Sequence, residues 1–404
     1  MPRLDSTTAG ESHGPALVVL VTGMPAGVPV DVPFINAELA RRQGGYGRGA
    51  RQRIESDAVE ILSGVRGGHT IGSPIALRIP NRDSRLDDAA RTPPVYRPRP
   101  GHADLAGSIK WLTTDCRETL ERASARETAS RVAAGALARC LLREFAIEVF
   151  AFVRSILDAA TPAEVTETTW KALRDARDAS ETYCPDAAAT QRQCAIIRQA
   201  KIDKDTVGGL VEAHVFGCPP GLGSCMDWRE KLDARLAGAV MGIQAFKAVE
   251  IGLGRECASR PGSKVHDPIR FDAARVDTPG LGFVRDSNNA GGLEGGMTNG
   301  QPVVVRGTMK PISTLLRGMP SVDLNTKLPE RSQYERSDVC AVPAASVVME
   351  NVVAFEIARA LRDKFGGDSL LEMRNNYDGF LRYARMLPLE PPIATLAADE
   401  EQRE

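Results

Sequence analysis

Segments with helical periodicity and segments with strand-like patterns follow one another irregularly along this chain. Helical runs begin after Ser124 and at about Asp233, and a third starts after Pro343 and ends before Gly366-Gly367. A first-turn proline and a trailing glycine are typical helix boundaries. The strand-like runs are residues 16–21, 59–62, 75–79, 210–215 and 302–306. Because helices and strands do not alternate as in a doubly wound sheet, we predict an α+β fold.

The helical run from Asp233 is defined by the spacing of its apolar residues. Leu236, Val240, Ile243 and Phe246 recur at helical intervals. We therefore expect one helix that carries all four side chains.

No break in composition divides the first 389 residues. The chain has 404 residues, 43% of them hydrophobic and 25% charged, which is typical of a soluble globular protein. Without a linker or an internal repeat, we expect one large domain over residues 1–389, followed by a disordered acidic tail over residues 390–404. Residues 155–205 and 255–296 resist assignment, and long loops of this kind are often lids or binding loops.

Charge and cysteine content narrow the function classes. The formal net charge is −1, which argues against a nucleic-acid partner. The eight cysteines lack the close spacing of a zinc site, so we expect no metal. The N-terminus has no signal-peptide pattern, and the longest apolar run is far shorter than the roughly 20 residues of a membrane helix. We expect a cytoplasmic protein that binds neither membranes nor nucleic acids.

Glycine-rich segments of the chain carry cationic side chains. GGYGRGAR contains Arg48 and Arg51 and follows Arg42, and a second glycine-rich turn from residue 291 leads to Lys310. Glycines expose backbone amides, and guanidinium groups bind phosphate or carboxylate in a forked geometry. The second segment suits a phosphate or the edge of a flavin. For the first segment the alternative is a solvated basic turn, and for the second it is a plain hairpin. The chain has neither a dinucleotide-binding GxGxxG nor a P-loop.

Two arginines stand at predicted helix starts. If Ser124 caps its helix, Arg126 lies in the first turn, where the helix dipole disfavours a cation by ~0.3–1 kcal/mol. A bound anion would reverse this cost. Pairing with Glu127 or exposure to water is the alternative. Arg336 and Asp338 precede the third helix in the same way.

Two of the five histidines are candidates for proton transfer. His13 lies in GESHG before an apolar strand, and His102 lies in RPRPGHAD among arginines and prolines. Imidazole is the natural proton carrier near neutral pH. His214, at the end of a strand-like run, is expected to be structural.

GESHG also satisfies the G-x-S-x-G pattern of serine hydrolases, with Ser12 as the nucleophile. That pattern requires a strand, a sharp turn and a helix, whereas here the motif leads into a strand-like run. A hydrolase remains an alternative that a covalent serine probe would test.

Eight sequence blocks resemble the chorismate synthase family. Three of them, at residues 9–28, 121–137 and 336–352, resemble its signature segments. The others are RRQGGYGRGAR, RPGHADLAG, MGIQAFKAVEIG, NNAGGLEGGMTNGQP and MKPIST, and all occur in the expected order. Residues 155–205 match the family only loosely.

The resemblance implies a single large β-α-β sandwich-type domain and a carbon–oxygen lyase acting on phosphates. The reaction would be the 1,4-anti elimination of phosphate from 5-enolpyruvylshikimate 3-phosphate to give chorismate, in the shikimate pathway of aromatic amino acid biosynthesis. The flavoprotein would use reduced FMN without net redox change, with NADPH or an external flavin reductase as the source of electrons. A homotetramer is implied. A non-catalytic paralogue that binds flavin or anions is the alternative.

The resemblance also implies residue roles. His13 would protonate or neutralise the departing phosphate, His102 would manage the protons of the reduced flavin, and Asp338 would assist removal of the ring hydrogen through flavin N5. The substrate anions are assigned to Ser12, Arg42, Arg48, Arg51, Arg99 and Arg126, and NADPH, where used, to Arg42 and Arg48. FMN is assigned to Arg122, Ala123, Ser124, Gln244, Ala245, Gly295, Lys310, Pro311, Ile312, Ser313, Thr314 and Arg336.

Overall fold

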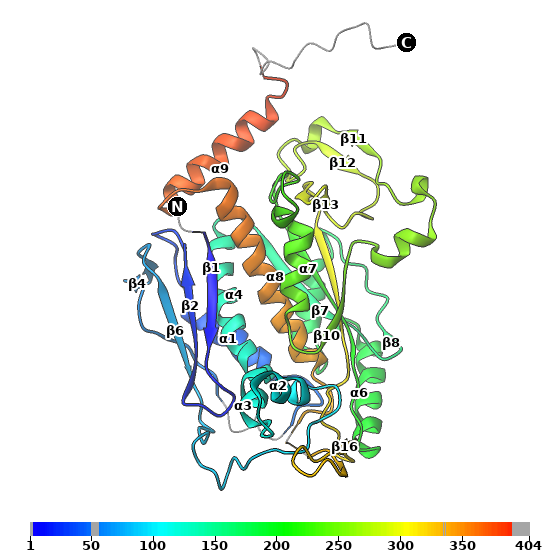
Figure 1. Ribbon diagram of the computed structural model, residues 1–404. Coiled ribbons are helices and arrows are strands. Elements are labelled where there is room, and N and C mark those ends of the chain that lie inside the picture. The colour runs from blue at the N-terminus through cyan, green and yellow to red at the C-terminus, as the bar shows by residue number, and fades with distance from the viewer. Residues whose placement is uncertain (1–2, 50–55, 334, 336, 390–404) are drawn as a thin grey trace, which may run out of the picture.

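Two β-sheets enclose a layer of helices in the computed structural model, which describes residues 3–49, 56–333, 335 and 337–389 (Figure 1). The helix α4 (Thr128–Arg143) packs on one sheet, and α8 (Val342–Phe365) packs on the other and along α4. This β-α-β layering confirms the predicted α+β class. Residues 390–404, the predicted tail, lie outside the described part of the chain.

The first sheet is antiparallel, in the order β1-β2-β6-β3. Its strands are β1 (Asp5–Ala9), β2 (Ala16–Thr22), β6 (Ile75–Pro80) and β3 (Glu60–Ile61). Alternation along β2 buries Leu17, Val19 and Val21 fully, because successive strand residues point to opposite faces. The hairpin of β4 (Val65–Arg66) and β5 (His69–Thr70) follows β3.

The second sheet has the order β10-β15-β9-β7-β8 and is also antiparallel. Its strands are β10 (Phe246–Ile251), β15 (Val303–Met309), β9 (Gly209–Phe216), β7 (Glu148–Ile156) and β8 (Ala159–Ala160). In β7, Phe150 and Phe152 are fully buried, and Phe150 lies in one cluster with Trp170 of α5 (Trp170–Asp178). Both faces of β7 are covered, so its sequence is a run of apolar residues without alternation. Such a run does not distinguish a strand from a buried helix.

The helix layer is tightly packed around α8. Most of its residues are buried, and α1 (Val32–Gln43) and α7 (Leu232–Met241) flank it. On α4, a Cβ at Gly135 would lie 2.2 Å from the carbonyl oxygen of Asn351. Glycine at this position therefore sets the distance between the two central helices.

The prediction of one helix through Phe246 is wrong. The helix α7 ends at Met241 with Gly242 as its C-cap, and Phe246 begins β10. All four apolar residues are buried in the same core. Side chains before and after the turn that follows α7 both face this core, and their spacing in the sequence therefore resembles that of a single helix. The unassigned residues 155–205 contain β8, α5 and α6 (Ala187–Ile202).

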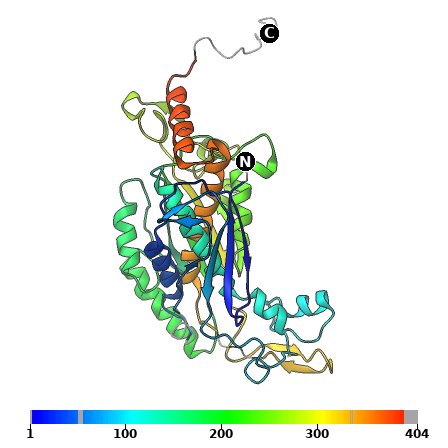
Figure 2. The same cartoon turned by 90° about the vertical axis from the view of Figure 1, so that its left-hand side faces the viewer.

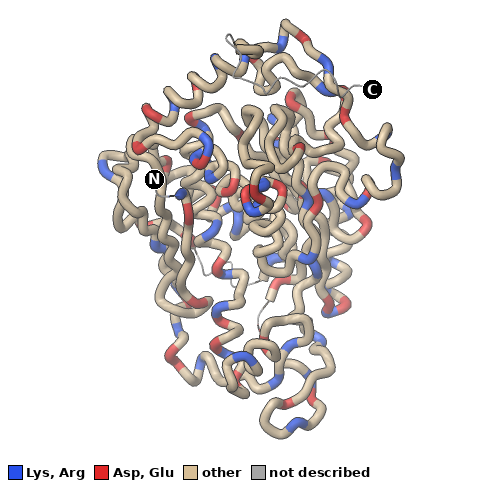
Figure 3. The backbone as a smooth tube through the Cα atoms, turned by 45° about the horizontal axis from the view of Figure 1, so that its top comes forward, with Lys and Arg blue, Asp and Glu red and all other residues tan. Residues whose placement is uncertain are grey.

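The remaining elements lie at the two ends of the molecule. At one end are α2 (Asp104–Trp111), α3 (Arg117–Ala123), β16 (Pro320–Val322) and β17 (Pro329–Arg331), opposite α9 (Leu370–Arg385) (Figures 1 and 2). Residues 255–296 form 3₁₀ turns, the hairpin β11 (Ile269–Phe271)–β12 (Phe283–Arg285) and β13 (Leu293–Glu294), which pairs with β14 (Met297–Thr298). Positively and negatively charged residues are interspersed along the backbone (Figure 3). None of the described helices is long and apolar enough to cross a bilayer.

Candidate active site

A cavity of about 640 Å³ opens where the first turns of α4 and α8 meet the end of α1. Residues 124–128 and 341–348 supply parts of its lining. The N-terminus of a helix carries a partial positive charge and free N–H groups, so two helices favour an anion in this cavity.

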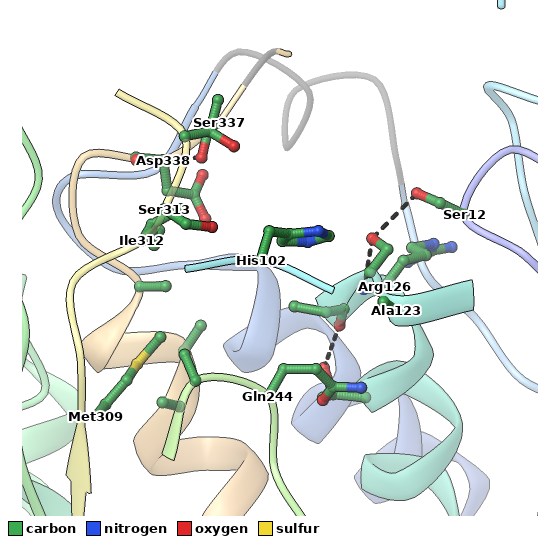
Figure 4. A pocket seen from close by; sticks show the side chains of 18 of the residues that line it. Ser12, His102, Ala123, Arg126, Gln244, Met309, Ile312, Ser313, Ser337 and Asp338 are labelled. Carbon is green, nitrogen blue, oxygen red and sulfur yellow. Dashed lines mark hydrogen bonds between the residues drawn. The ribbon is translucent and has the colours of Figure 1, made fainter. Parts of the chain in front are cut away.

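The cavity brings together most of the residues assigned from the sequence. They are Ser12, His13, Arg42, Arg48, Arg99, His102, Ala123, Ser124, Arg126, Gln244, Ala245, Lys310, Pro311, Ile312, Ser313, Thr314 and Asp338. In the view of Figure 4, His102 lies between Asp338 on one side and Arg126 and Ser12 on the other. These residues come from loops at the ends of elements far apart in the chain, as is usual for functional sites.

Asp57 holds two of the arginines in the wall. Its Oδ2 lies 2.6 Å from Nη1 of Arg126 and 3.5 Å from Nη1 of Arg42. Arg126 thus pairs with Asp57 and donates to Asn81 at 2.9 Å. It is buried, so it is neither exposed to water nor paired with Glu127 in the way that the alternative expected. Burial, together with repulsion from Arg126 and other cations, lowers the pKa of Arg42 to about 9 despite attraction to Asp57. Among the described residues, the carboxylate of Asp57 thus contacts both buried cations of this wall.

Arg48 and Asp338 form an ion pair on another side of the cavity. Nη1 of Arg48 lies 2.5 Å from Oδ2 of Asp338, and the backbone N–H of Gly49 donates to Oδ1 at 2.6 Å. The glycine-rich segment after α1 thus positions both a guanidinium and a backbone donor at Asp338.

His102 belongs to a triad with Arg99 and Asp104. Nε of Arg99 donates to Asp104 at 2.8 Å, and Nη1 of Arg99 donates to Thr314 at 2.9 Å. Nδ1 of His102 contacts the same carboxylate. Burial raises the pKa of Asp104, but hydrogen bonds from His102 and Arg99 outweigh it and hold that pKa well below its usual range. An ionised carboxylate therefore orients both side chains.

His13 also pairs with a buried carboxylate. It lies in the turn between β1 and β2, and its Nδ1 is 2.8 Å from Oε1 of Glu121. Sequence reasoning missed Glu121, Asp104 and Asp57. The only available signal was that Asp104 follows His102 by two residues and that Glu121 lies in a signature segment.

The remaining wall is less charged. Gln244 and Ala245 form the turn between α7 and β10, and Ala245 has a φ of 69°, a left-handed conformation that is rare for residues other than glycine. The carbonyl of Ala245 accepts from the N–H of Lys310 at 2.9 Å, which ties the turn to the segment after β15. Ile243, Met309 and Ile312 add apolar surface.

Four of the residues assigned from the sequence are not among the described residues that line the cavity. Arg122 donates to the carbonyls of Gly10 and Thr8, both at 3.0 Å, and Gly295 lies in the turn between β13 and β14. Arg51 and Arg336 lie outside the described residues.

Two further expectations concern His214 and Ser12. His214 is buried, contacts Glu212 at 2.7 Å and stacks on Phe152, as expected of a structural histidine. Ser12 lies between two strands, β1 and β2, so its motif lacks the helix that a nucleophile elbow requires. Its Oγ accepts from Ser124 at 3.2 Å.

The fold and the cavity define an α+β protein with an arginine-lined pocket of a size suited to a small molecule. A profile of the chorismate synthase family matches residues 4–361. The chain belongs to this family, and it is a lyase.

Individual relatives agree over nearly the full length. A chorismate synthase from Geobacter sulfurreducens is 53% identical over 388 residues, and the match covers 94% of this chain and 98% of that relative. One from Desulforamulus reducens is 52% identical over 390 residues, covering 94% and 99%. A solved structure described as the crystal structure of chorismate synthase has a TM-score of 0.76 and 39% identity, covering 96% of this chain and all of that one.

Proposed function

We propose that this protein removes phosphate from 5-enolpyruvylshikimate 3-phosphate by a 1,4-anti elimination and releases chorismate. The observation that carries the proposal is the convergence of four arginines, two helix N-termini and two carboxylate-paired histidines in one cavity. The substrate carries a phosphate and two carboxylates, and guanidinium groups bind such anions through paired hydrogen bonds.

The arginine walls are proposed to bind and orient the substrate. Arg42 and Arg126 would face one anion together with Ser12, and Arg48 and Arg99 would face the others. Arg51 is assigned to the same role on the family pattern alone. Because Arg42, Arg99 and Arg126 are buried, their charges act with little screening by water.

The wall formed by Gln244, Ala245, Met309 and Ile312 fits FMN, because one of its polar atoms is buried and available to a ligand. Oε1 of Gln244 is buried and has no hydrogen-bond partner among the described residues, so it can accept from an N–H of the flavin. Ile312 and Met309 would contact the rings, and Lys310, Ser313 and Thr314 offer donors to the flavin phosphate. When bound, reduced FMN would supply electron density to the allylic carbon–oxygen bond as it breaks.

Proton transfer is proposed for three side chains. His13 would neutralise the departing phosphate, and His102 would hold the proton required beside the flavin. Asp338 would assist removal of the ring hydrogen, and it is held by Arg48 and Gly49.

We also propose assembly as a cytoplasmic homotetramer, with NADPH bound near Arg42 and Arg48 or an external reductase supplying electrons. Light scattering of the purified protein tests the tetramer.

The experiment that tests the function is anaerobic turnover of the substrate with chemically reduced FMN, followed by the absorbance of chorismate. Parallel reactions contain oxidised FMN alone or oxidised FMN with NADPH. Product with reduced FMN is the expected result, and product with NADPH would add an intrinsic flavin reductase. Folded protein that binds FMN but forms no product in any reaction would contradict the proposal in favour of a non-catalytic paralogue.

A further inference from the structure

The ring of His13 is held from both sides by residues that the proposed function does not use. Glu121 of α3 accepts from the backbone N–H of His13 through Oε2 at 2.8 Å, and its Oε1 lies 2.8 Å from Nδ1. On the other side of the ring, Nη2 of Arg85 lies 3.0 Å from Nε2. Glu121 is 2% exposed, so water does not compete for its carboxylate.

These contacts are compatible with one protonation state of the ring. A guanidinium only donates hydrogen bonds, so Nε2 must present its lone pair to Arg85. The ring proton then lies on Nδ1, which faces the acceptor oxygens of Glu121. A cationic imidazole would direct an N–H against the N–H groups of Arg85.

The charged groups around the ring support this arrangement. Asp83 lies 3.8 Å from Nε2 of His13 and 3.2 Å from Nε of Arg85, and Arg117 lies 3.5 Å from Glu121. Each carboxylate thus has a guanidinium beside it. Burial raises the pKa of Glu121, but hydrogen bonds from His13 and the nearby charge of Arg117 are among the contacts that together lower it, so Glu121 accepts as a carboxylate.

We propose that Glu121 is a positioning residue that fixes His13 as the neutral Nδ1–H tautomer, with Nε2 as the nitrogen that exchanges protons, and that Arg85 holds Nε2 as an acceptor before substrate binds. His13 therefore begins the cycle as a base. A proton taken up from water at Nε2 makes the ring cationic, and its transfer to an oxygen of the departing phosphate returns the ring to the neutral tautomer. This last step rests on the proposed function.

The test compares Glu121→Gln with Glu118→Gln, an exposed acid on the same helix. Histidine labelled with ¹⁵N is observed by solid-state NMR in the substrate-free protein, and His13→Asn assigns the signal among five histidines. In the wild type at pH 8 we expect Nδ1 protonated and Nε2 unprotonated. In Glu121→Gln we expect the Nε2–H form to appear, kcat to fall about 10- to 100-fold and the acid limb of its pH profile to move. The KM for substrate and the Kd for FMN should stay within about twofold of the wild type, and Glu118→Gln should match the wild type throughout.

Two results would overturn the inference. One is a wild-type His13 that is protonated at Nε2 at pH 8, a measurement that does not require the variant to fold. The other is a Glu121→Gln protein with wild-type tautomer and kcat. If the wild type makes no chorismate, the proposed function fails, and the tautomer still decides the role of Glu121.

Discussion

At the scale of the residue, two buried cations of the cavity wall share the carboxylate of Asp57. Asp57 is fully buried at its side chain and stands between Arg42 and Arg126. Replacing Asp57 by Asn removes the carboxylate that contacts both buried guanidinium groups, and removing one partner of a buried pair typically costs 3–5 kcal/mol. We expect Asp57→Asn to lower the free energy of unfolding by about this amount, and added inorganic phosphate to restore more stability to it than to the wild type. Urea unfolding with and without phosphate measures both, with exposed Asp87→Asn as the control. An equal gain from phosphate in all three proteins would contradict the shared-carboxylate interpretation.

Arg48 tests whether substrate and flavin occupy different walls. A hydrogen bond to a charged group contributes about 1.5–3 kcal/mol, so Arg48→Ala should raise the Kd for substrate roughly 10- to 100-fold. The Kd for FMN should change less than about threefold, because Arg48 lies with Asp338 rather than with Gln244. Separate titrations of the two ligands measure this ranking, and Arg97→Ala, at an exposed ion pair with Glu330, is the control. The reverse ranking would mean that the phosphate pocket is misplaced.

Residue identity and residue role were not equally predictable from the sequence. His13 and His102 could be selected because imidazole next to glycine and arginine is uncommon and chemically specific. Glu121 and Asp57 could not, since a carboxylate acquires its role from partners distant in the chain. Glu121 lies 108 positions from His13, and Asp57 lies 69 positions from Arg126. Only folding brings these pairs together.

At the scale of the element, α4 and α8 approach each other through Gly135. In an exposed helix interior, alanine is more stable than glycine by roughly 0.5–1 kcal/mol. At Gly135, however, a Cβ would meet the backbone of Asn351, so Gly135→Ala should lower stability by about 1–3 kcal/mol. Gly238 of α7 is the matched control, since a Cβ there meets nothing within 4 Å. Gly238→Ala should be neutral or stabilising in the same denaturant titration, and a similar gain at Gly135 would show that the helices can separate without cost.

Buried charges connect the same helices and give a pH-dependent prediction. Glu38 of α1 lies 2.9 Å from Arg139 of α4 and 2.7 Å from Arg41. Burial raises the pKa of Glu38, but these two cations outweigh it and lower the pKa to about 2. A depressed pKa contributes stability that is present above the unfolded value near 4.3 and lost as the pH falls toward 2. Glu38→Gln should therefore be about 3–5 kcal/mol less stable than the wild type at pH 7, and the difference should shrink between about pH 4.3 and 2. Urea titrations across this pH range measure the difference in the free energy of unfolding. As the control, Glu60→Gln, which removes an exposed ion pair with Arg78, should show a small difference at every pH.

Element boundaries were predictable where caps are local and failed where packing decides. The third helix was bounded by Pro343 and the glycines after Phe365, and α8 ends at Phe365. The strand β7 was not predicted, because both of its faces are covered by helices. The helix α9 was missed although Ser369 and Glu372 form a capping box, a signal present in the sequence.

At the scale of the whole molecule, one hydrophobic core includes side chains from both sheets and from the helices between them. Lining residues of the cavity range from Ser12 to Val348. We therefore propose that the domain over residues 1–389 unfolds as one unit, and that a ligand in the cavity stabilises both sheets equally. FMN at a hundredfold excess over its Kd should add about 2.7 kcal/mol. Hydrogen exchange under conditions of global unfolding should show this increase in both β2 and β9. Riboflavin, which lacks the phosphate, is the control and should give a smaller increase. Protection confined to β9 and its neighbours would place a domain boundary between the two sheets.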